Sequence, residues 1–349
     1  MFTPSEKFES RDELLDAVLA GVPHAALIIS RDSKVSWANE IAKSLFGTAL
    51  LGRHFGLSLR QPDLLSAVAQ CLMAQTPAKL RLSLRQGDQE GNFAITLSPL
   101  PNAVMCLFED VTPQEQTDLM RRDFVANVSH ELRTPLTAIQ GFIETLQGPA
   151  RDDDAARTRF LKIMSTEAER MNRLVSDLLH LSRVEAQERL RPETEIDVAA
   201  AIGRAVDGLR PLAERANIKL TTTGFDMPRL LLADADQIMQ VVVNLVENAI
   251  KYGSVGGSRV DIALTETVTL RGPAYCFSVQ DYGAGISEEH IPRLTERFYR
   301  VDAHRSRAQG GTGLGLAIVK HIVSRHRGKL SVESSLGKGS RFSVFLPLG

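Results

Sequence analysis

Three successive patterns of hydrophobic and polar positions divide the chain. In the first, over residues 12–111, short runs alternate between apolar and polar side chains, and one stretch has the spacing of an amphipathic helix. The strands expected from this pattern cover residues 24–30, 34–40, 78–86, 92–100 and 102–110, and the helix covers residues 62–75. This region is therefore predicted to be a small α+β domain with an antiparallel sheet, in which Trp37 belongs to the sheet or the core.

The second pattern, over residues 112–190, has the period of long helices. Apolar side chains line one side of residues 112–147 and one side of residues 152–188, and residues 148–154 are typical of a turn followed by an acidic helix cap. The two stripes consist of Leu119, Phe124, Val128, Leu132 and Leu136, and of Met164, Met171, Leu174, Leu178 and Leu181. Because a two-helix hairpin leaves such stripes uncovered, we expect a second copy to complete a four-helix bundle, which makes the chain a homodimer.

The third pattern, over residues 196–349, interleaves helices and strands. The expected helices cover residues 198–217, 235–252 and 315–326, and the expected strands cover residues 218–223, 259–266, 274–281, 329–335 and 340–348. Such an alternation, over about 150 residues, predicts an α/β sandwich of ordinary domain size. The whole chain is thus expected to be a multidomain α+β protein.

Composition and charge narrow the class of protein. With 349 residues, 43% of them hydrophobic and 24% charged, the chain has the composition of globular domains, and its net charge of -1 attracts neither nucleic acid nor an anionic membrane. Cys71, Cys106 and Cys276 lie far apart without metal or redox spacing, which is typical of reduced thiols in the cytosol. We find no signal peptide, and no apolar run of the ~18 residues that a membrane span needs. We therefore expect a cytoplasmic protein, peripheral to the membrane only through a partner.

One histidine, His130 in "SHELRTPL", stands out in the first long helix. A zinc-protease helix would need a second histidine four residues later, where the chain has Thr134. The polar neighbours of His130 favour an accessible nucleophilic imidazole over a core histidine, and an adjacent carboxylate such as Glu131 would raise its basicity. Pro135 removes a backbone donor, so it either bends the helix into a hinge below His130 or merely kinks a bundle helix.

Three segments of the third region together predict a site for ATP and Mg²⁺. "GGTGLGL", at 310–316, opens onto a helix and suits phosphate binding, although it is neither a Walker A loop nor a dinucleotide fingerprint. "DYGAG", at 281–285, places a carboxylate ahead of two glycines, where it can accept a hydrogen bond from an exocyclic amine such as that of adenine. "NLVENAIKY", at 244–252, sets two amides on one helix face with a lysine one turn later. Each segment alone has an ordinary structural explanation.

Taken in order, these segments resemble the H, N, G1, F and G2 boxes of two-component sensor histidine kinases. The resemblance covers residues 113–349 and includes "IPRLTERFYRVD" at 291–302 as the F box. Within the family, this segment and "GLAIVKHIVSRH" look most like the phosphate-regulon sensor kinases. The resemblance implies a PAS-like sensor domain at 12–111, a dimerisation and phosphotransfer hairpin at 112–190, and a Bergerat-type ATP-binding domain at 196–349. Asn39 in "WANE" and the exit segment "FEDVT" carry the weaker PAS match.

The resemblance also implies residue roles in catalysis. His130 would be the phospho-acceptor and Glu131 the base that activates it, while Glu131 and Thr134 together would position the water that dephosphorylates the partner. Positioning and electrostatics would supply most of the rate of phosphoryl transfer. The phosphoryl group would then pass to an aspartate of a separate response regulator, and an upstream regulatory protein would act on the kinase.

For the cofactors, the resemblance implies a residue set around ATP and Mg²⁺. Asn248 would hold Mg²⁺ with support from Asn244, and Asp281 would recognise adenine. Residues 286–310 would form a mobile lid over ATP. The remaining contacts would come from Lys251 and Tyr252 to phosphates, from Gly283 and Gly285 in the adenine turn, and from Gly311, Thr312, Gly313, Leu314 and Gly315 to the phosphates.

Some features depart from the family pattern, and other functions stay open. The family often has threonine after the position of Tyr252, where this chain continues "GSVGGS", and the usual membrane spans are missing. The alternatives are an ATPase or chaperone of the same ATP-binding superfamily, whose hairpin only dimerises, and a signalling scaffold with an inert ATP site. The sequence also does not separate a kinase from a protein that works mainly as a phosphatase.

Overall fold

The computed structural model describes residues 17–86, 89–188, 190–253, 258–302 and 311–348. The chain forms two compact units, Met1–Val125 and Ala126–Gly349. Among the described residues, none of the helices combines the length and apolarity needed to cross a membrane.

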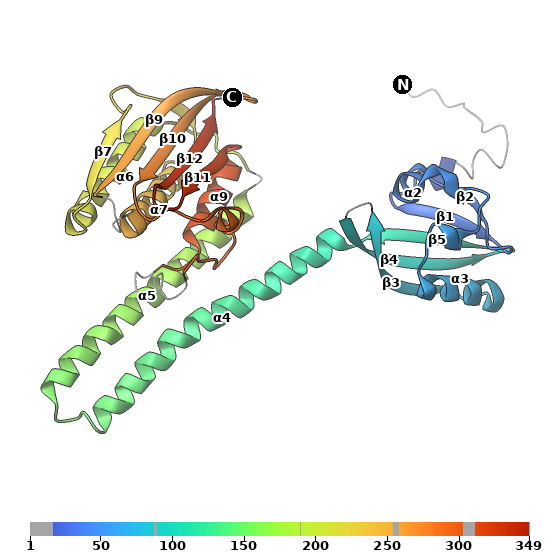
Figure 1. The fold of residues 1–349 in the computed structure, drawn as a ribbon, viewed down its shortest axis with the longest axis horizontal. Coiled ribbons are helices and arrows are strands. Elements are labelled where there is room, and N and C mark those ends of the chain that lie inside the picture. Colours follow the sequence, from blue (N-terminus) through green and yellow to red (C-terminus); the bar gives the residue numbers. More distant parts are fainter. Residues whose placement is uncertain (1–16, 87–88, 189, 254–257, 303–310, 349) are drawn as a thin grey trace. The chain divides into compact units, whose positions relative to one another are not determined.

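The first unit is built on a five-stranded antiparallel sheet (Figure 1). Its strands, in the spatial order β2-β1-β5-β4-β3, are β2 (Val35–Ala38), β1 (Ala25–Ser30), β5 (Ala103–Asp110), β4 (Gln89–Leu100) and β3 (Ala78–Gln86). Helix α3 (Pro62–Ala74) packs on β3, β4 and β5, and the inward side chains of strands and helix form one apolar core. The α+β domain and its strands are as predicted, each within a few residues.

The structure corrects the end of the expected strand at 34–40. The strand stops at Ala38 because Asn39 begins a helix that the sequence pattern did not predict, α2 (Glu40–Phe46). The buried Asn39 side chain accepts hydrogen bonds from the amides of Ala42 at 2.9 Å and Ala26 at 3.0 Å, and donates to the carbonyl of His24 at 2.8 Å. An asparagine cap thus ties α2 to β1. Two short 3₁₀ turns, η1 (Thr48–Leu50) and η2 (Phe55–Leu57), follow α2.

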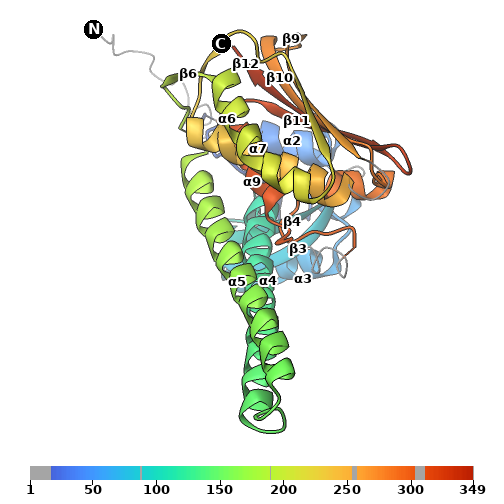
Figure 2. The same ribbon diagram turned by 90° about the vertical axis from the view of Figure 1, so that its left-hand side faces the viewer.

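The predicted helical hairpin is present. Helix α4 (Thr112–Gln147) and helix α5 (Asp154–Gln187) run antiparallel (Figure 2), and the Asp153 carboxylate caps α5 by accepting from the amide of Ala156 at 2.8 Å. Helix α4 continues through Pro135, and this proline is buried. The predicted stripes are only partly uncovered in the single chain: Leu119 and Leu136 are exposed, whereas Leu174 and Leu181 are already buried. Other large apolar side chains of the hairpin are also exposed, among them Met120, Val125, Leu161, Val175 and Leu179. Exposed apolar side chains of this kind are what the expected four-helix bundle would bury.

The third predicted region is a two-layer sandwich. Its five-stranded sheet has the order β11-β12-β10-β9-β7, in which only the β7–β9 pair is parallel. The strands are β7 (Lys219–Thr223), β9 (Arg259–Thr269), β10 (Gly272–Asp281), β11 (Lys329–Ser335) and β12 (Gly339–Pro347). A separate two-stranded sheet of β6 (Glu195–Asp197) and β8 (Leu230–Leu232) was not predicted from the sequence.

Three helices cover one face of this sheet (Figure 1). They are α6 (Val198–Arg215), α7 (Ala235–Gly253) and α9 (Gly315–Arg325), each within two residues of its predicted bounds. Helix α7 packs against α6, α9, β9 and β10, so it lies at the centre of the layer. The apolar side of α7 is buried against the inward side chains of the sheet. The polar side chains of α7 therefore lie on the opposite side of the helix.

The hairpin and the sandwich form a single unit because α5 docks on α9. Arg297 donates to the carboxylate of Glu185 at 2.6 Å, and the His321 ring lies 3.0 Å from the carboxylate of Glu188. Arg325 donates from Nε to the carbonyl of Leu190 at 2.9 Å. The sequence pattern predicts the hairpin and the sandwich as two separate regions. In the structure they are joined by contacts between charged residues that lie far apart in the sequence.

A buried histidine connects the first turn of α7 to the end of α9. The His326 side chain is 4% exposed, its Nδ1 lies 2.8 Å from the carbonyl of Ile322, and its Nε2 accepts from the amide of Asp234 at 3.1 Å. This arrangement requires a neutral ring that carries its proton on Nδ1. Burial lowers the pKa of His326, and the hydrogen bond to Ile322 opposes that effect.

We expect this histidine to make the fold acid-sensitive. Because the folded state lowers the pKa of His326, the folded state binds fewer protons than the unfolded chain, and stability falls as the pH drops below the unfolded value of about 6.5. One such proton changes the free energy of unfolding by at most about 1.4 kcal/mol per pH unit. Calorimetry of the full chain between about pH 7.5 and pH 5.5 should show a weaker pH dependence in His326→Gln than in the wild type, and no change in the exposed-site control His54→Gln. Equal pH dependence in all three proteins would contradict the prediction.

Candidate functional site

A cavity of about 400 Å³ lies in the second unit, between α7, the sheet edge, the glycine-rich turn and α5. Most of the residues expected to bind nucleotide line it: Asn244, Asn248, Lys251, Tyr252, Asp281, Gly285, Gly311, Thr312, Gly313 and Gly315. Two of the expected residues, Gly283 and Leu314, do not line it. Residues 254–257 and 303–310, which include the "SVGG" of "GSVGGS" and the end of the expected lid, lie outside the described residues.

Asp281 stands at one end of the cavity, on the last residue of β10. Its side chain is 6% exposed, and Oδ1 accepts from the amides of Gly283 at 2.9 Å and Ser340 at 3.3 Å. Burial raises the pKa of the Asp281 carboxyl, and these two backbone donors oppose that effect. Since both bonds fall on Oδ1, Oδ2 is left to accept from the amino group of a purine.

The glycines of the site are required by close backbone approach. A Cβ on Gly283 would lie 2.7 Å from the carbonyl oxygen of Tyr252, so this glycine shapes the turn without lining the cavity. Gly313 has φ +74°, and a Cβ there would lie 2.8 Å from the Cα of Phe298. A Cβ on Gly315 would lie 2.6 Å from Oδ1 of Asn244. The space that a side chain would occupy is thus filled by backbone at Gly283 and Gly313, and by the Asn244 side chain at Gly315.

The glycine-rich turn leads into the N-terminus of α9. The Thr312 hydroxyl accepts from the amide of Leu314 at 3.3 Å, and the Leu314 side chain is fully buried. The Leu314 amide is therefore already partnered inside the turn, whereas Gly311, Gly313 and Gly315 face the cavity. A helix N-terminus with glycines at its entry attracts phosphate through backbone N–H groups and the helix dipole.

Helix α7 presents amides and one ion pair to the same space. Asn244 donates to the carbonyl of Gln240 at 2.9 Å, and Lys251 pairs with Glu247 at 2.6 Å. Among the described residues there is no cluster of three or more histidine, cysteine or carboxylate side chains that could hold a metal ion. A Mg²⁺ ion at Asn248 would therefore need phosphate oxygens and water as its other ligands, which fits the way proteins bind this ion with nucleotides.

Two wall residues from the hairpin were not predicted from the sequence: Arg173 and Asp177, one helical turn apart on α5. Tyr299 and Arg300, which follow the 3₁₀ turn η3 (Glu288–Arg293) and belong to the segment predicted as a lid, also line the cavity. Arg173 and Asp177 are four residues apart, which places them on the same polar side of α5. Their spacing does not indicate which other element that side of the helix contacts. The Thr312 hydroxyl donates to the carboxylate of Asp177 at 2.7 Å.

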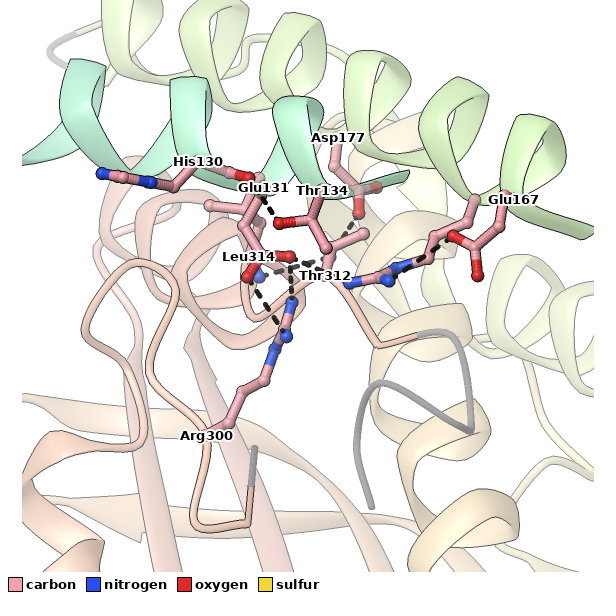
Figure 3. Close-up of polar contacts among 9 residues, drawn as sticks. His130, Glu131, Thr134, Glu167, Asp177, Arg300, Thr312 and Leu314 are labelled. Atoms are coloured by element: carbon pink, nitrogen blue, oxygen red, sulfur yellow. Dashed lines mark hydrogen bonds and ion pairs between the residues drawn. The ribbon is translucent and has the colours of Figure 1, made fainter. Parts of the chain in front are cut away.

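The predicted base, Glu131, lies in a cluster with two arginines (Figure 3). Its carboxylate pairs with Arg170 of α5 at 2.9 Å and with Arg300 at 3.1 Å, and all three side chains are less than a fifth exposed. The Nε of Arg300 is buried and has no hydrogen-bond partner among the described residues, although Arg300 lines the cavity. This N–H is closed to the cavity in this conformation, so only a movement of the Arg300 side chain would offer it to a phosphate oxygen.

His130 is exposed and its ring points away from this cluster (Figure 3). Thr134 contacts the backbone of His130 and not its ring: the threonine hydroxyl donates to the His130 carbonyl at 3.1 Å. In this conformation Glu131 is engaged by arginines rather than by the imidazole. Its role as base stays a prediction that requires a rearrangement.

Two family models match the chain at the elements that build this site. Residues 120–187 match the His Kinase A (phospho-acceptor) domain, and residues 233–349 match the histidine kinase-, DNA gyrase B- and HSP90-like ATPase. The chain is 36% identical over 332 residues to the phosphate regulon sensor protein PhoR of Pseudomonas aeruginosa, an alignment that covers 93% of this chain and 72% of the relative. The chain belongs to the sensor histidine kinases. It is a protein histidine kinase that phosphorylates itself and acts on a response regulator.

Other relatives of the kinase agree with this assignment. The sensor-like histidine kinase SenX3 of Mycobacterium tuberculosis (strain H37Rv) is 36% identical over 347 residues, which cover 96% of this chain and 80% of the relative. SenX3 of Mycolicibacterium smegmatis is 39% identical over 242 residues, which span only 60% of its length. The crystal structure of histidine kinase ThkA in complex with response regulator protein TrrA has a TM-score of 0.52 at 24% identity, covers 95% of this chain and 98% of that one, and supports the fold.

A pair of glycine substitutions tests the cavity wall. Gly313 and Gly337 have nearly the same positive φ, +74° and +76°, but only a Cβ on Gly313 meets neighbouring backbone. Both Gly→Ala variants should lose about 1 kcal/mol of stability through strain, whereas only Gly313→Ala should also lose ATP affinity, by at least about tenfold. Thermal unfolding and titration calorimetry with ATP measure the two effects. Equal ATP affinity in the two variants would refute this account of the wall.

Proposed function

We propose that the kinase binds ATP and Mg²⁺ in the described cavity, phosphorylates His130 of the same chain, and passes the phosphoryl group to an aspartate of a separate response regulator of the phosphate-regulon type. One observation carries the central step. Arg300 lines the cavity and also pairs with Glu131, the residue beside His130. The phosphate end of the cavity therefore adjoins the helix that carries the phospho-acceptor.

In this proposal the base of ATP binds at the Asp281 end. Oδ2 of Asp281 accepts a hydrogen bond from the exocyclic amine of adenine, and Gly283 and Gly285 allow the surrounding turns to pack closely. Guanine carries a carbonyl oxygen where adenine has its amine, so a buried carboxylate acceptor disfavours it. Asp281 thus gives the site its preference for adenine.

The phosphates bind at the opposite end, between α7 and the turn before α9. Amides of the glycine-rich turn, Lys251 and Tyr252 contact phosphate oxygens, and the guanidinium of Arg300 takes a further one. Asn248 holds Mg²⁺ with support from Asn244. When bound, Mg²⁺ neutralises the charge that builds up on the phosphate oxygens during transfer.

The transfer requires Glu131 to leave its arginines. A phosphate that engages Arg300 competes with the carboxylate for the same guanidinium, and Glu131 must also release Arg170 before it can accept a proton from the imidazole. His130 then attacks the terminal phosphorus in line with the leaving oxygen. In the phosphatase activity, Glu131 and Thr134 position the water that hydrolyses the phosphoryl group of the regulator.

Signal input and assembly complete the proposal. The PAS-like domain at 12–111 receives the signal with an upstream regulatory protein, the hairpin at 112–190 dimerises through its exposed apolar side chains, and the domain at 196–349 binds ATP. The kinase acts in the cytoplasm, at the membrane through a partner. The similarity to PhoR supports a phosphate-responsive pathway. Residues 286–310 act as the lid, of which the structure describes 286–302.

The rival functions make different predictions about covalent chemistry. An ATPase or chaperone turns over ATP without forming a phosphoprotein, and a scaffold with an inert site does neither. The intact cavity with its glycines and Asn248 argues against the scaffold. A protein that is mainly a phosphatase would still carry the acceptor histidine, so rates rather than residues separate that function from a kinase.

Substitution of the acceptor tests the proposal directly. The wild-type protein incubated with γ-labelled ATP and Mg²⁺ should gain an acid-labile, base-stable label, as expected of a phosphohistidine, and His130→Gln should gain none. His54→Gln, which alters an exposed histidine of the first unit, serves as the matched control and should label like the wild type. Label on His130→Gln would sink the assignment of the acceptor.

Mixed dimers test transfer within one chain. Because Arg300 and Asp177 of a single chain join its cavity to its own hairpin, we expect His130→Gln mixed with Asp281→Asn to stay unlabelled. Transfer between chains would instead restore label, since each chain then supplies the part that the other lacks. The measurement is the labelled fraction after subunit exchange, checked with differently tagged wild-type chains.

A further inference from the structure

A carboxylate from the hairpin stands in the wall of the ATP cavity. Asp177 of α5 lines the same space as Lys251 and the glycine-rich turn, and its Oδ2 accepts from the Thr312 hydroxyl at 2.7 Å. Figure 3 shows this bond between the helix and the turn. The cavity wall holds four carboxylates, those of Asp177, Glu247, Asp281 and Asp302, and Asp177 is the one that the hairpin supplies.

The contact reaches the amides of the phosphate-binding turn through one hydroxyl. Thr312 donates to Asp177 and accepts from the amide of Leu314, the residue that precedes α9. The carboxylate is therefore hydrogen-bonded, through Thr312, to the positive end of the α9 dipole. An anion at a helix N-terminus is stabilised there, and a second anion competes for the same field.

The charges around Asp177 support this view of the site. Burial raises the pKa of its carboxyl, whereas the Thr312 hydrogen bond and the nearby His180 and Lys251 lower it. The carboxylate is thus partly removed from water, so its charge acts on the cavity with less screening than a surface charge has. A second, small pocket is lined by Thr312 together with Glu131, Pro135, Arg170, Met171 and Leu174 of the hairpin.

We propose that Asp177 is an affinity-determining residue that opposes ATP binding, because its carboxylate is held at the phosphate-binding turn by Thr312 while the hairpin is docked. The negative charge of Asp177, which α5 brings to the turn, repels the triphosphate. The contact between Asp177 and Thr312 therefore disfavours ATP binding, and bound ATP disfavours that contact. By linkage, each event weakens the other by the same factor. The inference rests on the proposed function, since it concerns the nucleotide of that site.

Asp177→Asn separates charge from shape. Asparagine keeps an oxygen that accepts from Thr312 but removes the negative charge, so the turn should stay in place. Titration calorimetry on the full chain with Mg²⁺ should show ATP binding about tenfold tighter in Asp177→Asn than in the wild type, ADP binding tightened less, and adenosine binding unchanged. The KM for ATP in autophosphorylation should fall by a similar factor.

Glu169→Gln is the matched control on the same helix. Glu169 is an exposed carboxylate of α5 whose Oε1 lies 3.5 Å from the Ser165 hydroxyl of the same helix, and it does not line the cavity. Its substitution should leave affinity for ATP, ADP and adenosine within twofold of the wild type. Higher ionic strength should narrow the difference between Asp177→Asn and the wild type, because salt screens the repulsion.

Three results would overturn the inference while leaving the proposed function intact. They are ATP affinity in Asp177→Asn equal to or below that of the wild type, an equal gain in affinity for adenosine, and a fall in kcat with an unchanged KM. Failure of the wild type to bind ATP at all would instead overturn the proposed function, and the inference with it.

Discussion

The carboxylate of Glu131 connects the parts of the kinase on which catalysis depends. It pairs with Arg170 of the neighbouring hairpin helix and with Arg300 from the cavity wall, and little of any of these side chains is exposed. Removing one member of such a cluster leaves a buried charge without its partner, at a cost of about 3–5 kcal/mol. A phosphate oxygen is one of the few groups that can replace the carboxylate, so the cluster is stable until a nucleotide competes for it.

The cavity is a joint product of two regions that the chain pattern separates. Helix α7, the edge of the sheet and the glycine-rich turn form most of its wall, and α5 supplies Arg173 and Asp177. The residues of α5 at the docking contact include charged ones, such as Glu185, which pairs with Arg297, and the buried apolar Leu181 and Val184 lie on the same part of the helix. Nucleotide affinity at such a site depends on the position of the hairpin helix α5.

Much of the architecture followed from periodicity, because helices and strands with one buried face repeat their apolar positions. The hairpin helices, α6, α7, α9 and the strands of both main sheets lie within a few residues of the predicted ranges. Helix α2 escaped prediction because its start depends on the Asn39 cap, and β6 and β8 escaped because three-residue strands carry no period. The glycines were recognisable because backbone approach excludes any side chain at positions such as Gly313.

The sequence by itself determined the groups proposed for catalysis: His130 as the acceptor, the amides of α7, the carboxylate of Asp281 and the glycine-rich turn. These are local patterns, and each arises from a single helix or turn. Only the tertiary structure decided that Glu131 faces two arginines instead of His130, that Arg300 joins the cavity to the hairpin, and that Asp177 meets Thr312. Such pairs lie far apart in the chain, and only packing of the sandwich on α5 decides which charged side chains meet.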